Sequence, residues 1–206
     1  MGTIFDSDYF EDEIFQKTIL VKGEISNTQF MDCTFISCSF NSSAFIDCRF
    51  QNCTFNICDL SLANINRSSF SNTVFRKSKT IGLNWSSAFW SNNSAHILSN
   101  PIDFFECTLD YSSFIGLKLG NINIEDCSAI EVDFSEAILT GANFKGSDFR
   151  NAIFRNTDLS SANFIGAKNY SISPHGNKIN KAKFTMPEAM NLLYSMDISI
   201  DNISDE

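Results

Sequence analysis

The stretch TQFMDCTFISCSFNSSAFIDCRFQNCTFNICDLSLAN, residues 28–64, decides the fold. A large apolar residue, here called a centre, returns at every fifth position: Phe30, Phe35, Phe40, Phe45, Phe50, Phe55 and Leu60. A small residue stands two positions before each centre: Thr28, Cys33, Cys38, Ser43, Cys48, Cys53 and Cys58. Helices repeat their apolar face about every 3.6 residues and strands every 2, so a period of five fits neither. Each block of five is therefore predicted to be a short straight run followed by a corner.

The period divides the rest of the chain into predicted segments. Residues 1–25 keep the period weakly, and Asp8 and Glu13 occupy the small position, so this segment is predicted to be an N-terminal cap or arm. Regular blocks fill residues 26–95, and a break with the turn signal Asn100-Pro101 follows at residues 96–103. The blocks resume one residue out of step over residues 104–170.

Residues 171–206 lose the period and are predicted to form a C-terminal cap, with a short helix and an acidic tail. Thr185 and Glu188 match a capping box, and Pro187 suits a first helical turn. The apolar face of this helix is wider than a single contact requires, so it is predicted to cover the last coil and also to join two copies of the chain. The candidate dimer-contact residues are Met186, Met190, Leu192, Leu193 and Met196.

All seven cysteines fall at the small position. Buried cysteine is a compact hydrophobe, so core filling explains them better than metal binding or disulfides, although pairs twenty residues apart can come within disulfide distance. The chain shows no membrane-length apolar run and no basic secretory leader, which favours a cytoplasmic location.

Several blocks resemble the pentapeptide-repeat family: ANFKG at 142–146, TDLSS at 157–161 and ANFIG at 162–166. The resemblance implies an all-β fold, a right-handed quadrilateral parallel β-helix in which four blocks make one coil, here followed by the short C-terminal α-helix. Residues twenty apart then stack. The predicted core ladder is Phe30, Phe35, Phe40, Phe45, Phe50, Phe55, Phe70, Phe75, Phe144, Phe149, Phe154 and Phe164.

A rod filled by its own side chains has no interior for a catalytic site. Its two histidines are isolated, and the sequence has no phosphate-binding glycine loop. We therefore expect a protein that is not an enzyme and that binds no cofactor and no metal.

Any function therefore depends on the outer surface of the rod, and the charge on this surface is uneven. The chain carries 15 Lys and Arg against 24 Asp and Glu, a balance that does not attract nucleic acid but can attract a protein that binds it. Residues 67–79 contain Arg67, Arg76, Lys77 and Lys79 and no acid. The candidate partner-binding residues form an acidic belt: Asp103, Glu106, Asp110, Glu125, Asp126, Glu131, Asp133 and Glu136.

The chain is similar to Qnr-type members of the family in its length, its single rod and its apolar C-terminal helix. Those proteins bind DNA gyrase or topoisomerase IV as DNA mimics, and their rods join through C-terminal elements. The resemblance implies a homodimer that binds a topoisomerase and protects it against quinolones. This DNA-mimic hypothesis predicts that the acids of the belt share one face. Qnr proteins of Gram-negative bacteria carry projecting loops, whereas residues 96–103 are the single candidate loop here. A scaffold with another protein partner and a host-directed effector stay open as alternatives.

Overall fold

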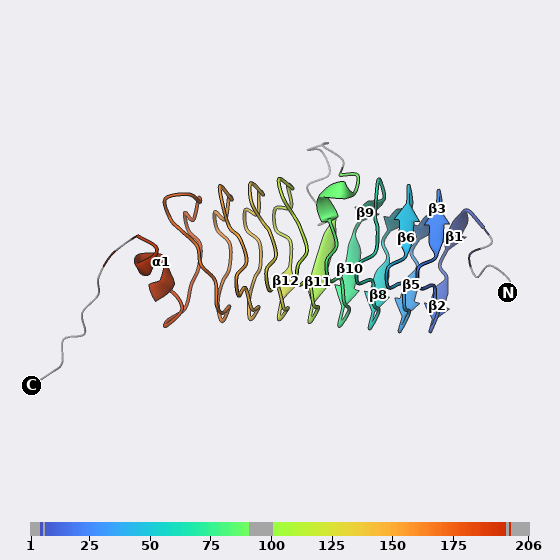
Figure 1. Ribbon diagram of the computed structural model, residues 1–206, viewed down its shortest axis with the longest axis horizontal. Helices are drawn as coiled ribbons and strands as arrows, with labels where there is room; N and C mark the ends of the chain where they lie inside the picture. The colour runs from blue at the N-terminus through green and yellow to red at the C-terminus, as the bar shows by residue number, and fades with distance from the viewer. Residues whose placement is uncertain (1–4, 6, 91–100, 197, 199–206) are drawn as a thin grey trace, which may run out of the picture.

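The structure, a computed structural model, describes residues 5, 7–90, 101–196 and 198. The chain winds into a rod of stacked coils, with β1 to β3 at one end and α1 at the other (Figure 1). One sheet contains β1 (Tyr9–Glu11), β4 (Gln29–Met31), β7 (Arg49–Gln51) and β9 (Ser69–Ser71). A second contains β2 (Ile14–Gln16), β5 (Thr34–Ile36), β8 (Thr54–Asn56), β10 (Thr73–Arg76), β11 (Ile102–Phe105) and β12 (Ile124–Glu125). A third contains β3 (Glu24–Ser26) and β6 (Ala44–Ile46).

Parallel pairing joins residues twenty positions apart, as in Phe10↔Phe30 and Phe30↔Phe50. The residue two places after a centre has a positive φ, for example 54° at Asp32 and 53° at Ser37, which turns the chain through a corner. One corner in every five residues and one coil in every twenty give four sides. This confirms the quadrilateral parallel β-helix that the resemblance to the pentapeptide-repeat family implied.

We number the four sides in chain order. Side 1 carries β1, β4, β7 and β9, and side 2 carries β2 and the strands that pair with it. Side 3 is formed by single bridges such as Ser39↔Asp59 and Thr108↔Ser128. Side 4 carries β3 and β6 and continues through bridges such as Ser113↔Asp133.

The centres fill the rod. The rings of Phe30 and Phe50 lie parallel with their centroids 5.0 Å apart, and those of Phe35 and Phe55 lie 4.5 Å apart. Rings on neighbouring sides of one coil meet edge to face, a geometry that aromatic quadrupoles favour. All twelve residues of the predicted core ladder are buried.

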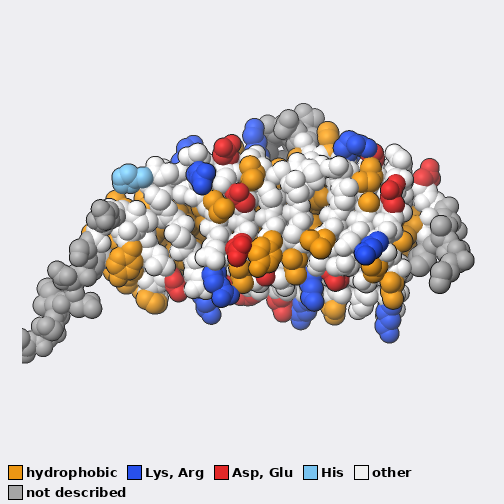
Figure 2. All heavy atoms as spheres, in the orientation of Figure 1, with side chains coloured by type: hydrophobic (Ala, Val, Ile, Leu, Met, Phe, Trp, Pro, Cys, Tyr) orange, Lys and Arg blue, Asp and Glu red, His pale blue; other side chains and the backbone are white. Residues whose placement is uncertain are grey.

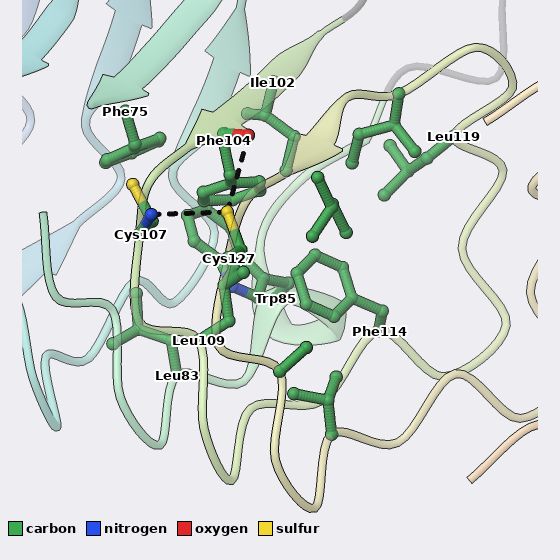
Figure 3. Close-up of a cluster of buried hydrophobic side chains, with 14 of the residues drawn as sticks. Phe75, Leu83, Trp85, Ile102, Phe104, Cys107, Leu109, Phe114, Leu119 and Cys127 are labelled. Atoms are coloured by element: carbon green, nitrogen blue, oxygen red, sulfur yellow. Dashed lines mark hydrogen bonds between the residues drawn. The ribbon is translucent and has the colours of Figure 1, made fainter. Parts of the chain in front are cut away.

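The small residues two places before the centres connect one coil to the next through hydrogen bonds. The Ser68 hydroxyl accepts the N–H of Cys48 at 2.9 Å and donates to the carbonyl of Phe45 at 2.8 Å. Cysteine takes the same place: the Cys107 N–H donates to Cys127 Sγ at 3.3 Å, among the packed rings of Figure 3. All seven cysteines are free and buried.

The first coil begins earlier than predicted. Residues 1–25 were expected to be a cap or arm, yet β1 and β2 already pair with β4 and β5. The side chains of Asp8 and Glu13 are exposed because this coil lies at the open end of the rod. Their carbonyls still accept the N–H groups of Gln29 and Thr34, so an acid at the small position does not prevent coil formation there.

The irregular segment also differs from the prediction. Phe75 pairs with Phe104, a step of 29 residues instead of twenty, so nine extra residues enter one coil. The break was expected at residues 96–103, but Ile102 and Asp103 already pair in β11 with Thr73 and Val74. Most of the predicted break lies outside the described residues. Before it, η1 (Trp85–Ser87) places Trp85 in the core.

The last coil extends beyond residue 170, where the period was predicted to end. Lys178 and Lys183 bridge to Asp158 and Asn163, and the Phe184 ring stacks on Phe164 at 5.2 Å. α1 (Met190–Tyr194) then covers this end of the rod, and Leu192 packs against the core.

The predicted start of the C-terminal helix is wrong. α1 begins at Met190, and its N-cap, Ala189, makes no side-chain capping bond. The Thr185 hydroxyl instead accepts the N–H of Gly166, and Glu188 accepts a hydrogen bond from Asn191. Contact with the last coil therefore replaces the expected capping box.

Candidate partner-binding surface

The exposed members of the acidic belt lie on three successive corners. Glu106 and Asp126 occupy stacked positions on the corner between sides 2 and 3, with φ of 53° and 52°. Glu131, with φ 55°, lies on the corner between sides 3 and 4. Glu136, with φ 62°, lies on the corner between sides 4 and 1. Each corner turns the chain onto a new side, so the four carboxylates point in three directions, and Glu106 and Asp126 share one of them.

The other four belt residues are half-buried on the sides themselves. Asp103 in β11 and Glu125 in β12 lie on side 2, Asp110 lies on side 3, and Asp133 lies on side 4. Lys118 occupies side 1 of the same part of the rod. The belt thus wraps three sides, and the prediction that its acids share one face is wrong.

Several belt carboxylates are held by their neighbours. Glu125 forms an ion pair with Lys145 at 3.2 Å, and Glu106 forms one with Lys77 at 3.5 Å. Asp110 accepts hydrogen bonds from the Ser128 hydroxyl at 2.6 Å and from the Ile130 N–H at 3.0 Å. These contacts join neighbouring coils, so part of the belt supports the fold.

Side 2 carries a ladder of side-chain amide hydrogen bonds that was not predicted from the sequence. The amide of Asn123 donates to Asp103 at 3.0 Å, that of Asn143 to Asn123 at 3.3 Å, and that of Asn163 to Asn143 at 3.1 Å. These residues stand one place before centres and twenty apart, a spacing that could have revealed them. The ladder links four successive coils and satisfies the amide and carboxylate groups along side 2.

The basic residues of 67–79 do not form one patch, because they lie on different sides of the rod. Arg67, on the corner between sides 4 and 1, forms a bidentate pair with Asp47 and holds the pKa of this carboxyl below its ordinary value. The Arg76 guanidinium lies over the Phe105 ring on side 2, 4.4 Å from its centroid. On the face seen in Figure 2, charged side chains of both signs lie among apolar and neutral ones, without one large patch.

The predicted dimer-contact residues divide into two groups. Leu192 packs against the core and so covers the last coil. Met186, Leu193 and Met196 expose 68%, 39% and 39% of their surface, which leaves an apolar area at this end of the rod. The side chain of Met190 is half-buried and belongs to neither group.

Two shallow hollows lie along the edge between sides 4 and 1. One, of about 370 Å³, brings His175 and Lys178 beside Asp158. The other, of about 310 Å³, brings Arg49 and Phe89 beside the Asp47–Arg67 pair. Over the described parts of the chain, no group of three or more His, Cys, Asp or Glu side chains is arranged to hold a metal ion. No helix in those parts is long and apolar enough to cross a membrane.

The comparisons with known proteins agree with this architecture. The family profile described as "Pentapeptide repeat region" matches residues 28–114, and "Pentapeptide repeats (8 copies)" matches residues 118–156 and 137–168. Full-length QnrB1, a plasmid-mediated fluoroquinolone resistance protein, is 18% identical, with a TM-score of 0.51 over 90% of this chain and 100% of its own.

HetL is a pentapeptide-repeat protein involved in heterocyst differentiation regulation, from the cyanobacterium Nostoc sp. strain PCC 7120. It is 13% identical, with a TM-score of 0.43 over 86% of this chain and 87% of its own. A comparison with curated proteins found no match. At these identities the structural likeness concerns the fold. The coils, their corners and the two profile matches together show that the chain belongs to the pentapeptide-repeat family.

Proposed function

We propose that this protein is a non-catalytic binding rod and that its partner is a type II topoisomerase, DNA gyrase or topoisomerase IV, which it protects against quinolones. The observation that carries the proposal is the rod itself. Stacked aromatic side chains fill its interior, so its outer surface is what remains for function. The likeness in fold to full-length QnrB1 over 90% of the chain supports the choice of partner.

The acidic belt fits a partner that encloses the rod. Duplex DNA carries phosphate charge on every side, so a protein that surrounds DNA presents basic groups from several directions. The exposed corner acids Asp126, Glu131 and Glu136 point outward in three directions. The acids do not share the one face that the topoisomerase hypothesis required, so the belt is no longer its main support. The proposal rests on the rod and on the likeness in fold to full-length QnrB1, and a charge reversal at Glu131 tests the part of the belt in binding.

A second candidate function is an interaction scaffold with a different protein partner. The ion pairs of Glu106 with Lys77 and of Glu125 with Lys145 favour it, because they neutralise part of the belt and use it within the fold. Surface pairs of this kind contribute little stability, on the order of 0–1 kcal/mol each, and they also lower the charge available for DNA mimicry.

Binding of the full-length protein to purified gyrase, measured by biolayer interferometry, tests the choice of partner. The variant Glu131→Lys reverses an exposed corner charge and should weaken binding on the order of tenfold, mostly through slower association. Glu24→Lys is the matched control, because Glu24 is exposed in β3 near the other end of the rod. Equal binding by the two variants would remove the belt from the interface, and no binding of the unaltered protein would favour the scaffold.

We also propose that two copies join through the exposed apolar residues at the α1 end, and that the protein acts in the cytoplasm. The buried free thiols support a reducing location.

A further inference from the structure

One hollow on the rod combines groups that neither the fold nor the acidic belt requires. It lies where the corner between sides 4 and 1 meets side 1, it measures about 310 Å³, and it contains Gln29, Asp47, Arg49, Arg67 and Phe89. Arg49 lies between Gln29 and Ser69 in the sheet of side 1, while Arg67 stands twenty residues after Asp47 on the corner. The strand register therefore fixes both guanidinium groups on one edge.

The two arginines are bound very differently. Arg67 Nε donates to Asp47 Oδ1 at 2.7 Å, and its Nη2 donates to Oδ2. Both carboxylate oxygens of Asp47 are therefore bound by Arg67. The contact shown for the Arg49 side chain is a single 3.4 Å hydrogen bond to the neutral amide oxygen of Gln29. A guanidinium has five N–H donors, so Arg49 retains most of its capacity to bind an anion.

Phe89 supplies an apolar surface at the same place. Its N–H donates to the Ser68 carbonyl at 2.8 Å, which fixes the backbone, while its side chain is 62% exposed. Phe89 is also one of the phenylalanines that do not serve as centres. Aromatic side chains and arginine are enriched in the buried core of protein interfaces.

We propose that this hollow binds a segment of a partner protein in which a carboxylate lies next to a bulky apolar side chain. Arg49 takes the carboxylate, and the Phe89 ring packs against the apolar side chain. The Asp47 carboxylate in the same hollow is already bound by Arg67. Counting Arg49 and Arg67 against Asp47, the hollow has a charge of +1 on a chain of −9, so an acidic segment is drawn to this place on the surface. The inference rests on the proposed role as a protein-binding rod but not on the identity of the partner.

Nuclear magnetic resonance of the ¹⁵N-labelled full-length protein tests it, with acetyl-Leu-Asp-Leu-amide at millimolar concentration as the probe. Saturable shifts are expected at the amides of residues 47–49, 67–69 and 89. The neutral probe acetyl-Leu-Asn-Leu-amide should bind at least tenfold more weakly, because it lacks the charge that Arg49 recognises.

Variants identify the groups responsible. Arg49→Glu should weaken binding of the acidic probe at least tenfold, whereas Arg76→Glu, which changes an arginine on side 2, should leave it unchanged. Phe89→Ser, at an exposed ring, should weaken both probes and keeps the test valid even where Arg49→Glu fails to fold. Thermal melts of each variant check the fold.

Absence of shifts at the hollow, or equal binding of the two probes, would overturn the proposal. Tighter binding of a deoxythymidine decamer at the same amides would also overturn it in favour of single-stranded nucleic acid. A hollow that fails to bind the probe while gyrase binding persists leaves the proposed function standing. If the hollow binds the probe but the protein does not bind gyrase, the proposal for the hollow stands and the topoisomerase assignment fails.

Discussion

At the scale of single residues, two inward positions in each block stabilise the rod in different ways. The centre contributes apolar burial and ring stacking, as Phe50 does between Phe30 and Phe70. The small residue two places earlier hydrogen-bonds the neighbouring coil, as Ser68 does to Cys48. The period of five made both positions predictable. The hydrogen bonds were not predictable, because the sequence does not show where the facing backbone lies.

Replacement of Phe50 by alanine should lower the free energy of unfolding by about 3–5 kcal/mol, because it opens a cavity in the middle of a stacked ladder. Urea denaturation measures the loss. Phe89→Ala is the matched control, since its ring is 62% exposed and its removal should cost under about 1 kcal/mol. Similar losses for the two variants would mean that the ladder does not carry the stability.

Replacement of Ile57 by asparagine should raise the free energy of unfolding by about 1 kcal/mol. Ile57 holds a corner with φ of 57°, a region that β-branched residues avoid and asparagine tolerates, and its side chain is 55% exposed. The reciprocal change, Asn156→Ile at a corner with φ of 55°, should destabilise by a similar amount. Thermal melts compare the pair, and a loss of stability in Ile57→Asn would contradict the corner argument.

Stability should fall as the pH rises above about 9, because burial raises the pKa of the Cys53 thiol from 9.0 to about 12. In the unfolded chain the thiol ionises near 9.0, whereas in the folded rod it stays protonated, so unfolding releases a proton between these two values. Urea denaturation at pH 8 to 11 measures the slope. Cys53→Ser removes this titration and should make the dependence shallower; an unchanged slope would exclude Cys53 as a source.

At the scale of elements, the sequence predicted the coils well but placed their ends poorly. The first coil was assigned to a cap because acids stood at Asp8 and Glu13, yet an end coil has solvent on one side and accommodates them. The last coil was missed because the blocks before it are irregular, although Phe184 stands twenty residues after Phe164 and stacks on it. The helix start was misplaced because Thr185 is already bonded to Gly166.

Deletion of residues 125–144 should give a folded rod that is one coil shorter. The deletion removes twenty residues, and Ile124 then precedes Lys145 in the phase that the coils after the irregular segment share. Deletion of residues 125–146 is the control, because it leaves one coil two residues too short to complete four sides. Circular dichroism and urea melts should show a cooperative transition for the first deletion and loss of native structure for the second. Two equally stable products would contradict a coil of fixed length.

At the scale of the whole molecule, the rod separates a uniform interior from a varied surface. The interior follows from the period, so the sequence determines it in detail. The side on which each acid lies also follows from numbering: Asp126, Glu131 and Glu136 are five apart and therefore occupy successive corners. Partner identity depends on a second molecule, and no period in this chain encodes it.

The α1 end should form the dimer contact. Leu193→Asp places a charge on a side chain that is 39% exposed, so it should yield monomers without loss of the fold. Light scattering after gel filtration measures the mass. Tyr111→Asp is the control, at a 60% exposed apolar residue on a corner far from α1. A monomeric unaltered protein, or dimers of Leu193→Asp, would remove this end from dimerisation.

The most direct test of the account is a supercoiling assay with purified gyrase and ciprofloxacin, in which the full-length protein is titrated to micromolar concentration. We predict that the protein restores supercoiling in the presence of the drug, and that Glu131→Lys requires about tenfold more protein than Glu24→Lys for the same protection. Unchanged inhibition by the drug, together with unchanged activity of gyrase without it, would contradict the topoisomerase assignment and leave a binding rod with another protein partner.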